Sequence, residues 1–446
     1  MRVLFLYPNR YSIAISSLAW QGVWDLFNRS DDFECHRAVW ETAFPLQSIE
    51  TGEPWHRYDW IAVHFSWEID YLNFLLILEK NRIPLWSKDR NEGYPLILAG
   101  GLAVTLLPES MAPFCDGIVL GEAEGFLKQW QENKGGEYTL FNKTGQISRM
   151  STFSNIAVGN LIPSRIRVSS DLATPLFTPL LVPDSRFDSP FLIETARGCP
   201  GRCVFCATAF TREPALFYPG NLLWETIQAL VPPSTRRIGL VGAALGFHPD
   251  IKFLLERMLQ NDFKAGISSF RAEKIDTELC RLIDLHEIRS ITLAPETGDD
   301  SDRIALNKYI ANHQFLEAVT LLSNHTHIRE LRLYFIIGLG FDHEIQKIYS
   351  LTQSILKIFK GTITLSVNPF IPKKRTPWSD QPMESVKVLR KKYQQLQSIF
   401  RNLKKTTLLI SSLRLSEWET ALSTDPDSVL PLYETLRDKS ASAKPW

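Results

Sequence analysis

The sequence lacks a net charge, because 49 Lys and Arg residues balance 49 Asp and Glu residues over 446 positions. Proteins that bind nucleic acid usually carry an excess of positive charge on the binding domain, so the balance argues against a nucleic-acid footprint. No apolar run is long enough to span a membrane. The short apolar run at the N-terminus ends at Pro8 without a cleavage-site pattern, so it does not indicate a signal peptide. We expect no membrane partner.

Cysteine is also scarce. Six cysteines in a chain of this length are too few for a disulfide scaffold, so we expect a reducing, cytoplasmic location. Cys35, Cys115 and Cys280 lie far from one another in the sequence, and each is expected to be a small buried hydrophobic residue. The other three cysteines crowd into one short segment, which therefore carries most of the information in the chain.

That segment reads Gly-Cys-Pro-Gly-Arg-Cys-Val-Phe-Cys and contains Cys199, Cys203 and Cys206. Three thiolates on one short loop are the ligands that an iron–sulfur cluster takes from a protein. A [4Fe–4S] cluster has four irons, so three ligands leave one iron open to bind a substrate. A zinc site or a chance grouping is the alternative, but zinc needs a fourth Cys or His nearby. The next histidine is His248.

The N-terminal part of the chain alternates apolar stretches with amphipathic ones. Strands are predicted at residues 2–8, 34–40, 60–66, 95–101 and 116–122, and helices near residues 16–28, 68–80, 104–114 and 122–133. Five such β/α units indicate a doubly wound, Rossmann-like parallel sheet. Sheets of this kind bind ligands at the carboxyl ends of their strands.

The pattern loosens after this sheet and then resumes. Residues 136–188 are rich in Pro, Ser and Thr and are expected to form an extended linker. Strands follow at residues 191–196, 236–241, 264–268, 290–294, 330–337 and 362–367, with a helix after each. The sequence therefore predicts a sheet domain over 1–135, the linker, a second α/β domain over 189–385, and a helical C-terminal extension over 386–446.

The C-x3-C-x2-C spacing, with Phe205 directly before the third cysteine, resembles the cluster loop of the radical S-adenosylmethionine (SAM) superfamily. In that family the open iron chelates SAM, and reductive cleavage yields a 5′-deoxyadenosyl radical. Six strand–helix units with the cysteines directly after the first strand match the family's partial (β/α)6 TIM barrel. The predicted fold class is therefore α/β, with a doubly wound, B12-binding-like sheet, this barrel and a helical C-terminal tail. As in closed barrels, the chemistry is expected at the carboxyl ends of the strands.

The resemblance implies that Cys199, Cys203 and Cys206 are the metal ligands and the catalytic residues, and that Phe205 lies against the cofactor. Gly242 stands where many members carry a Gly-Gly-Glu-like segment that holds the amino group of SAM, but the acidic residue is missing here. Nearby loop charges are expected either to offset the charge of the cluster or to face solvent, namely Arg197 and Arg202.

Three further strand ends are implied to contact SAM. Ser269 and Arg271 end the third strand, where Arg271 is expected to pair with the carboxylate of SAM. Glu296 ends the fourth strand and is expected to accept hydrogen bonds from ribose hydroxyls; the alternative is that it pairs with Arg271 or Arg303. Gly338 ends the fifth strand, where the resemblance implies backbone contacts to adenine.

A doubly wound domain before a radical SAM barrel is similar to the layout of the cobalamin-binding radical SAM class. Gly100-Gly101, followed by a helix, and Gly121-Glu122 resemble segments of that domain. The Asp-x-His-x-x-Gly signature, which supplies a histidine to cobalt, is absent after the first strand. Many cobalamin-dependent members lack that histidine, so the resemblance still implies cobalamin. A degenerate domain that binds nothing, or one that binds substrate, is the alternative.

Taken together, these features predict a radical SAM enzyme with a [4Fe–4S] cluster, SAM and cobalamin as cofactors. The expected reaction is methyl transfer or a related radical modification of a small-molecule or macromolecular substrate. A reductant such as flavodoxin or ferredoxin is the expected partner. The alternatives are cobalamin-independent modification of a tRNA base or peptide, and a non-catalytic iron–sulfur protein.

Overall fold

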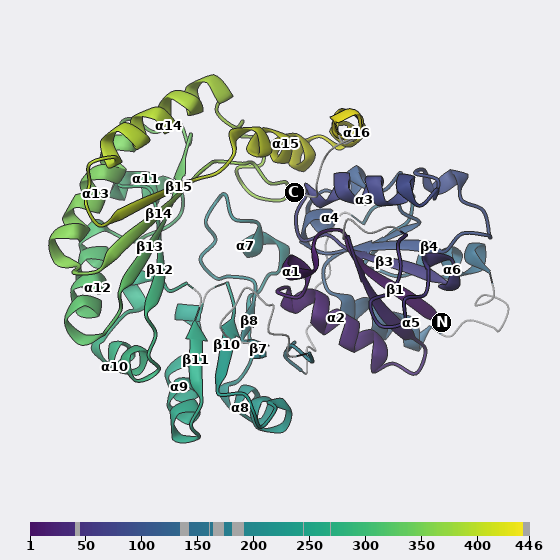
Figure 1. The fold of residues 1–446 in the computed structure, drawn as a ribbon, viewed down its shortest axis with the longest axis horizontal. Helices are drawn as coiled ribbons and strands as arrows, with labels where there is room; N and C mark the ends of the chain where they lie inside the picture. The colour runs from purple at the N-terminus through teal and green to yellow at the C-terminus, as the bar shows by residue number, and fades with distance from the viewer. Residues whose placement is uncertain are drawn as a thin grey trace. The chain divides into compact units, whose positions relative to one another are not determined.

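The computed structural model describes residues 1–40, 45–133, 142–159, 161–163, 174–180, 191–243, 245–267 and 269–439. The chain divides into two compact units (Figure 1). Unit 1 combines Met1–Arg186 with Ala421–Trp446, and unit 2 is Phe187–Thr420. In the part of the chain that the structure describes, no helix combines the length and apolar character of a membrane span.

Unit 1 is built on one sheet. Its strands are β1 (Arg2–Tyr7), β2 (Glu34–Val39), β3 (Trp60–His64), β4 (Leu96–Gly100), β5 (Gly117–Val119) and β6 (Ile156–Ala157). The strand order is β2-β1-β3-β4-β5-β6, with every pair parallel except β5 and β6. This is a doubly wound order, in which the strand order reverses between β1 and β3, and sheets of this kind bind ligands beside that reversal.

Helices cover both faces of this sheet (Figure 1). They are α1 (Tyr11–Ala14), α2 (Leu18–Asn28), α3 (Asp70–Lys80), α4 (Leu102–Leu106), α5 (Ala123–Glu132), α6 (Lys143–Met150) and α16 (Val429–Lys439), with short 3-10 turns η1 (Trp55–Arg57), η2 (Ser87–Asp89), η3 (Pro108–Ser110) and η7 (Pro426–Ser428). Aromatic side chains dominate the core on one face, where Trp60 and Trp130 pack edge to face at 4.9 Å. Tryptophan therefore serves mainly as core in this unit.

Helix α3 explains why α16, from the C-terminal part of the chain, packs in unit 1. Residues 70–78 of α3 are all buried, because its sequence Asp-Tyr-Leu-Asn-Phe-Leu-Leu-Ile-Leu is apolar on nearly every side. A helix that is apolar all round needs cover on both faces. The sheet covers one face, and α16 packs on α3 with Tyr433 and Leu436 buried.

Residues 136–188, which were expected to form an extended linker, contain a helix and a strand. Residues 143–150 form α6, and residues 156–157 form β6, which closes the edge of the sheet against β5. The rest of that range lies largely outside the described residues. The predicted domain boundaries stay predictions.

Unit 2 carries a curved row of parallel strands. They are β7 (Phe191–Glu194), β10 (Arg237–Val241), β11 (Lys264–Ile267), β12 (Ser290–Glu296), β13 (Glu330–Ile337), β14 (Thr362–Pro369) and β15 (Thr406–Ile410), with a small antiparallel pair β8 (Ala196–Arg197) and β9 (Leu216–Phe217). The strands pair in the orders β7-β10-β11 and β12-β13-β14-β15, and a parallel bridge between Ser269 and Thr292 joins the two sheets. The six predicted barrel strands are therefore neighbours in chain order, and β15 adds a seventh.

The helices of unit 2 lie mostly on the outside of this row, with α7 (Ala207–Thr211) on its inner side (Figure 1). They are α7 (Ala207–Thr211), α8 (Gly220–Leu230), α9 (Ile251–Gln260), α10 (Thr277–Leu285), α11 (Asp300–Ala305), α12 (Asn312–His325), α13 (Glu344–Ile358), α14 (Val386–Phe400) and α15 (Leu413–Thr424), with 3-10 turns η5 (Leu245–Phe247) and η6 (Ala272–Lys274). Strand side chains alternate strictly between buried and accessible along β13 and β14. The buried set packs under the helices, and the accessible set lines the inner face of the row.

Candidate functional site

The three cysteines lie on the loop that follows β8, at the carboxyl end of β7. We call residues 198–206 the cysteine loop. Gly198 opens it with φ +72°, and a Cβ there would lie 2.8 Å from the carbonyl oxygen of Arg212, so only glycine fits. Cys206 ends it: its N–H donates to the Cys203 carbonyl at 3.0 Å, and its own carbonyl begins α7 by accepting from Ala209.

Gly201 shows how closely the thiols approach one another. A Cβ on Gly201 would lie 3.3 Å from Cys199 Sγ, 4.0 Å from Cys203 Sγ and 3.2 Å from Arg271 Nη1. Glycine at this position therefore lets two thiols and a guanidinium lie close to the loop backbone, where a side chain would crowd them. Cys203 is 9% exposed, and burial raises the pKa of its thiol to about 11. Burial also raises the pKa of Cys206.

The cysteine loop is braced from two other parts of unit 2. The Val204 N–H donates to the Leu306 carbonyl at 3.1 Å, and Asn307 Nδ2 donates to the Arg202 carbonyl at 2.7 Å. On the other side, the Trp378 N–H donates to the Val204 carbonyl at 3.1 Å. These bonds satisfy loop backbone that no sheet or helix pairs, and so they hold the loop in one conformation.

Glu296 lies at the end of β12 and pairs with a residue that the sequence did not single out. Lys308 Nζ donates to Glu296 Oε1 at 2.7 Å and to the Ala294 carbonyl at 2.5 Å. Both side chains are largely buried, with 13% of Glu296 and 7% of Lys308 exposed. The pair is close enough to Cys203 to act on its pKa, where Lys308 lowers it and Glu296 raises it.

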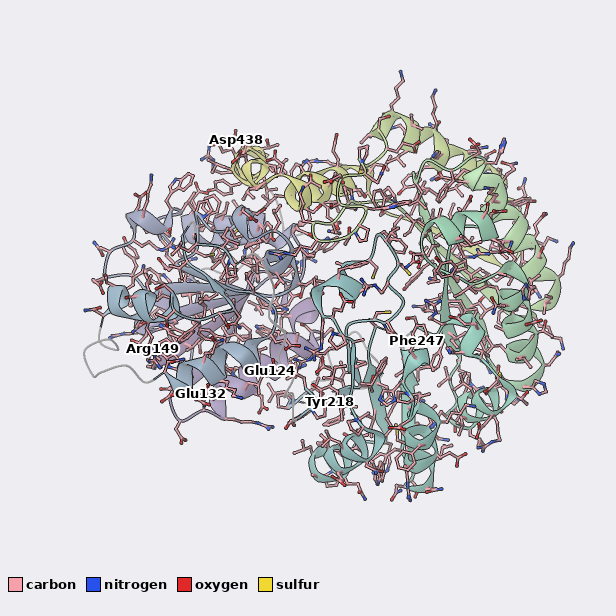
Figure 2. All side chains as sticks on the ribbon, turned by 180° about the vertical axis from the view of Figure 1, so that it is seen from behind. Glu124, Glu132, Arg149, Tyr218, Phe247 and Asp438 are labelled. Carbon is pink, nitrogen blue, oxygen red and sulfur yellow. The ribbon has the colours of Figure 1, made fainter. Side chains whose placement is uncertain are left out.

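Arg271 and Ser269 follow β11 and face the same region. Arg271 forms an ion pair with Glu273 and stacks on the ring of Phe247 at 4.8 Å, which Lys274 approaches at 5.4 Å. Phe247 is labelled in Figure 2. Ser269 forms the bridge to β12. The end of β11 therefore brings a guanidinium to the cysteine loop, with a carboxylate already beside it, and the expected pairing of Arg271 with SAM stays a prediction.

Two glycines expected at the SAM site differ in their surroundings. Gly242 directly follows β10, and a Cβ there would lie 2.7 Å from Thr195 Oγ1, so the residue permits close packing against the end of β7. Gly338 directly follows β13 with φ +76°, and its N–H donates to Glu344 Oε2 at 3.0 Å. The Gly338 N–H is thus engaged by a side chain of unit 2.

The remaining charges near the cysteine loop are paired within the protein. Arg197 binds Glu194 through Nε at 2.8 Å, and Arg202 forms an ion pair with Glu213. His248 Nε2 lies 2.9 Å from the Tyr218 carbonyl, and its Nδ1 accepts from the Asp250 N–H at 3.1 Å. This histidine positions the loop before α9.

The inner face of the strand row is accessible. Tyr334 on β13, Ser366 on β14 and Leu409 on β15 form one cross-strand row, and Ile336 and Asn368 form the next row toward the carboxyl ends. Tyr334 is 44% exposed and Leu409 53% exposed. Large apolar side chains that stay uncovered in a concave wall are typical of a surface that receives a ligand.

In unit 1 the predicted glycines lie at the carboxyl edge of the sheet. Gly100 ends β4, Gly101 has φ +110°, and Gly121 has φ +83° with its N–H donating to Thr105 Oγ1 at 3.1 Å. Glu122 precedes α5. The same edge carries two exposed apolar side chains, Trp67 after β3 and Leu102 after β4.

A buried polar cluster, which sequence reasoning missed, lies where the strand order reverses. Asp70 Oδ1 accepts from Asn9 Nδ2 at 2.8 Å and from Asn73 Nδ2 at 3.4 Å, and Asn73 also donates to the Pro8 carbonyl. Burial raises the pKa of Asp70 to about 7. His64, at the end of β3, shares a 2.8 Å hydrogen bond between Nε2 and Ser66 Oγ, and burial lowers its pKa to about 4.

The donor set fits a polynuclear cluster. A single metal ion needs ligands that converge on one point, at about 2.3 Å for zinc and sulfur. On an iron–sulfur cluster each thiolate binds its own iron, so the sulfurs surround the cluster instead. Cys199, Cys203 and Cys206 supply the three thiols of such a set, and the sulfurs of Cys199 and Cys203 both lie beside Gly201.

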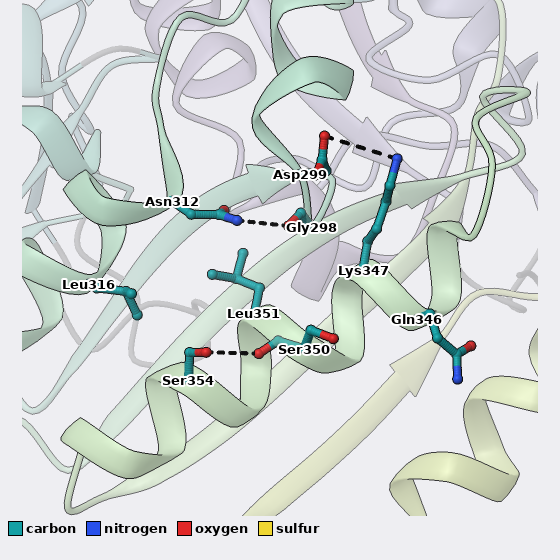
Figure 3. Close-up of a pocket in the computed structure, with 9 residues that line it drawn as sticks. All are labelled: Gly298, Asp299, Asn312, Leu316, Gln346, Lys347, Ser350, Leu351 and Ser354. Atoms are coloured by element: carbon teal, nitrogen blue, oxygen red, sulfur yellow. Dashed lines mark hydrogen bonds and ion pairs between the residues drawn. The ribbon is translucent and has the colours of Figure 1, made fainter.

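A hollow of about 450 Å³ lies elsewhere in unit 2, between α12 and α13 (Figure 3). Asn312 Nδ2 donates to the Gly298 carbonyl at 3.0 Å on its rim, and Lys347 lies 4.0 Å from Asp299. None of the predicted site residues lines it. It lies on the helix layer, whereas the predicted chemistry lies at the strand ends.

Comparisons with known proteins bear on this site. A family model described as "Radical SAM proteins, N-terminal" matches residues 20–156. The uncharacterized protein MJ0966 of Methanocaldococcus jannaschii is 25% identical over 385 residues, which cover 84% of this chain and 78% of that protein.

Two solved structures share the fold. The radical SAM methyltransferase TsrM from Kitasatospora setae, with cobalamin and a [4Fe–4S] cluster bound, matches with a TM-score of 0.58 at 11% identity, over 85% of this chain and 74% of that chain. The cobalamin-dependent SAM radical enzyme OxsB matches with a TM-score of 0.54 at 11% identity, over 96% of this chain and 56% of that chain. At this identity the likeness shows the fold alone. With the family model, it confirms the resemblance to the radical SAM superfamily and the predicted fold class.

Proposed function

We propose that the protein is a radical SAM enzyme that carries a [4Fe–4S] cluster on Cys199, Cys203 and Cys206. The observation that carries the proposal is the braced cysteine loop at the carboxyl end of β7, with the thiols of Cys199 and Cys203 both beside Gly201. A cluster of this kind, with SAM bound to its open iron, supplies a 5′-deoxyadenosyl radical after reduction. The electron would come from a reductant such as flavodoxin or ferredoxin.

The residues around the cysteine loop would bind and orient SAM. Arg271 offers a cation to a carboxylate beside Gly201, and Glu296 offers an acceptor for hydroxyl groups at the end of β12. The accessible inner face of β13 and β14, with Tyr334 and Asn368, would receive the substrate and exclude water from the radical. All six cysteines are free of disulfides, which suits a reducing cytoplasmic location.

We further propose that unit 1 binds cobalamin at the carboxyl edge of its sheet, so that the reaction is methyl transfer or a related radical modification. Bound cobalamin would supply the methyl group. Trp67, 47% exposed, and Leu102, 40% exposed, form an apolar rim on this edge that suits a large flat ring. His64 lies buried and hydrogen-bonded to Ser66, so it is not placed to be an axial ligand.

The experiment that tests the radical SAM proposal is anaerobic reconstitution with iron and sulfide, followed by an assay for 5′-deoxyadenosine from SAM with a reductant. We expect product from the wild-type protein and none from Cys203→Ala. The matched control is Cys280→Ala, because Cys280 is a buried cysteine on α10, away from the loop. A wild-type protein that binds no iron or makes no deoxyadenosine would overturn the proposal.

The cobalamin proposal has its own test. Wild-type protein incubated with hydroxocobalamin and passed through a desalting column should retain corrinoid absorbance. Trp67→Ala should retain several-fold less, whereas Leu161→Ala, which removes another exposed apolar side chain of unit 1, should retain as much as the wild type. Failure of the wild-type protein to retain corrinoid would refute cobalamin binding and leave the radical SAM proposal standing.

A further inference from the structure

Lys308 is a buried cation near the cysteine loop. Its side chain is 7% exposed, and its ammonium group binds both Glu296 and the Ala294 carbonyl at the end of β12. Its backbone is fixed as well, since the Lys308 N–H donates to the Arg303 carbonyl at 2.9 Å. A buried lysine is costly unless it is paired, and here Glu296 and the Ala294 carbonyl offset that cost.

The segment that carries Lys308 also holds the cysteine loop. The two residues before it, Leu306 and Asn307, bind the backbone of Val204 and Arg202 on either side of Cys203. Three consecutive residues therefore link the two elements, because Leu306 and Asn307 bind the cysteine loop and Lys308 binds the end of β12. Any displacement of this segment would move the cysteine loop and Glu296 together.

Glu296 is held in an uncommon backbone conformation. Its φ is +64°, in the left-handed region that residues other than glycine rarely adopt. The pairing of β12 with β13 is irregular between Leu293 and Glu296, so the strand bends at this point. Conformations of this kind persist where the surroundings over-determine them, and they are often found at functional sites. Here the bend directs the carboxylate to Lys308.

We propose that Lys308 is a positioning residue whose charge, balanced by Glu296, sets the reduction potential of the cluster on the cysteine loop. The inference rests on the proposed function, because it requires that cluster. Reduction adds one negative charge to a group that three thiolates already make negative. A nearby buried cation stabilises the reduced form, and a nearby carboxylate stabilises the oxidised form, because charges interact strongly in a poorly solvated site. The pair as a whole is neutral and therefore keeps the potential between these extremes.

The test is a redox titration of the reconstituted full-length protein without SAM, followed by electron paramagnetic resonance of the reduced cluster. Lys308→Met leaves Glu296 unbalanced and should shift the midpoint potential to a more negative value. Glu296→Gln leaves the ammonium unbalanced and should shift it to a more positive value. The double variant is neutral again, so its potential should return close to that of the wild type.

Two controls separate charge from structure. Lys308→Arg keeps the charge and should keep the potential near the wild-type value. Lys252→Met removes a lysine that pairs with Asp276 and Glu278 on the outer helices, and it should change nothing. A purely structural role would lower the amount of bound iron without opposite shifts in potential.

The outcomes are distinct. Opposite shifts of the two single variants support the inference, and so does the positive shift of Glu296→Gln alone if Lys308→Met loads no cluster. Potentials that stay at the wild-type value in fully loaded variants overturn it. A wild-type protein that assembles no cluster overturns the proposed function, and the inference with it.

Discussion

Because Gly101 has no side chain, the backbone that follows β4 can lie against the backbone that follows β3. The φ of Gly101 is +110°, and a Cβ would overlap the carbonyl oxygen of Phe65. We expect Gly101→Ala to destabilise unit 1 by about 2 kcal/mol or more, because backbone strain and a steric clash add. Chemical denaturation measures the loss.

The matched control for that prediction is Gly52→Ala. Gly52 also has a positive φ, +71°, but no atom lies within 4 Å of the position its Cβ would take. This variant carries the cost of the left-handed backbone without a clash, which is on the order of 1 kcal/mol. Equal losses for the two variants would show that the contact with Phe65 contributes nothing.

Asp70 makes the stability of unit 1 depend on pH. Burial raises its pKa to about 7 from 3.8, so the folded protein binds a proton that the unfolded chain has released between these values. Its contribution to stability is present below about pH 4 and is lost as the pH rises through 7. We expect Asp70→Asn, which stays neutral, to become more stable than the wild type over this range, by a few kcal/mol above pH 7.

The measurement is urea denaturation of both proteins between pH 4 and 8. Only their difference is informative, because His64 contributes the opposite slope: its pKa is lowered to about 4, so its contribution is lost as the pH falls below 6.5. Asp31→Asn, at an exposed position, should follow the wild type at every pH. A difference between Asp70→Asn and the wild type that does not change with pH would contradict the prediction.

At the scale of single residues, the sequence predicted groups of residues that are close together in the chain and missed contacts between residues that are distant in the chain. The cysteine loop could be recognised because its three ligands lie within one short spacing. Glu296 was expected to bind SAM or to pair with Arg271 or Arg303. Its ion pair is with Lys308, and the contact with SAM stays a prediction. No pattern marks that lysine, since its contacts depend on how the turn after α11 folds back onto β12. Asp70 was likewise hidden within an apolar helix.

At the scale of elements, α16 is required by the apolar surface of α3. Tyr433 on α16 is 1% exposed, and it lies close enough to Glu79 on α3 to interact with it. We expect Tyr433→Ala to destabilise unit 1 by about 3 kcal/mol, because it leaves a cavity in this contact. Thermal denaturation measures it, and the exposed neighbour Glu434→Ala should change stability by less than about 0.5 kcal/mol. Equal, small effects of both variants would show that α16 does not stabilise α3.

Elements with a regular pattern were predictable, and short or irregular ones were not. The alternation in β13 and β14 appears directly in the sequence, so these strands were predicted within about two residues at either end. β6 has two residues, too few to show any period. β15 was missed because its sequence, Thr-Thr-Leu-Leu-Ile, does not alternate between polar and apolar residues and so does not separate a strand from the end of a helical region. In the structure all five of its residues are at least partly accessible.

At the scale of the whole molecule, unit 1 is built from two segments that are far apart in the sequence. The sequence predicted a sheet domain, a barrel and a separate helical extension, because each has its own pattern. The structure assigns Ala421–Trp446 to unit 1, so unit 2 is an insertion between two segments of unit 1. The signal that could have shown this is α3 itself, since a helix that is apolar all round requires a second layer that the sheet cannot provide.

This arrangement makes a prediction about cooperativity. Chains with several units often unfold in more than one step. Gly101 and Tyr433 lie far apart in the sequence, yet Gly101→Ala and Tyr433→Ala should both lower the same calorimetric transition, because α16 completes the fold of unit 1. Leu333→Ala removes a fully buried side chain of β13 and should lower the other transition. If Tyr433→Ala instead shared its transition with Leu333→Ala, α16 would stabilise unit 2, and the division of the chain between the units would be wrong.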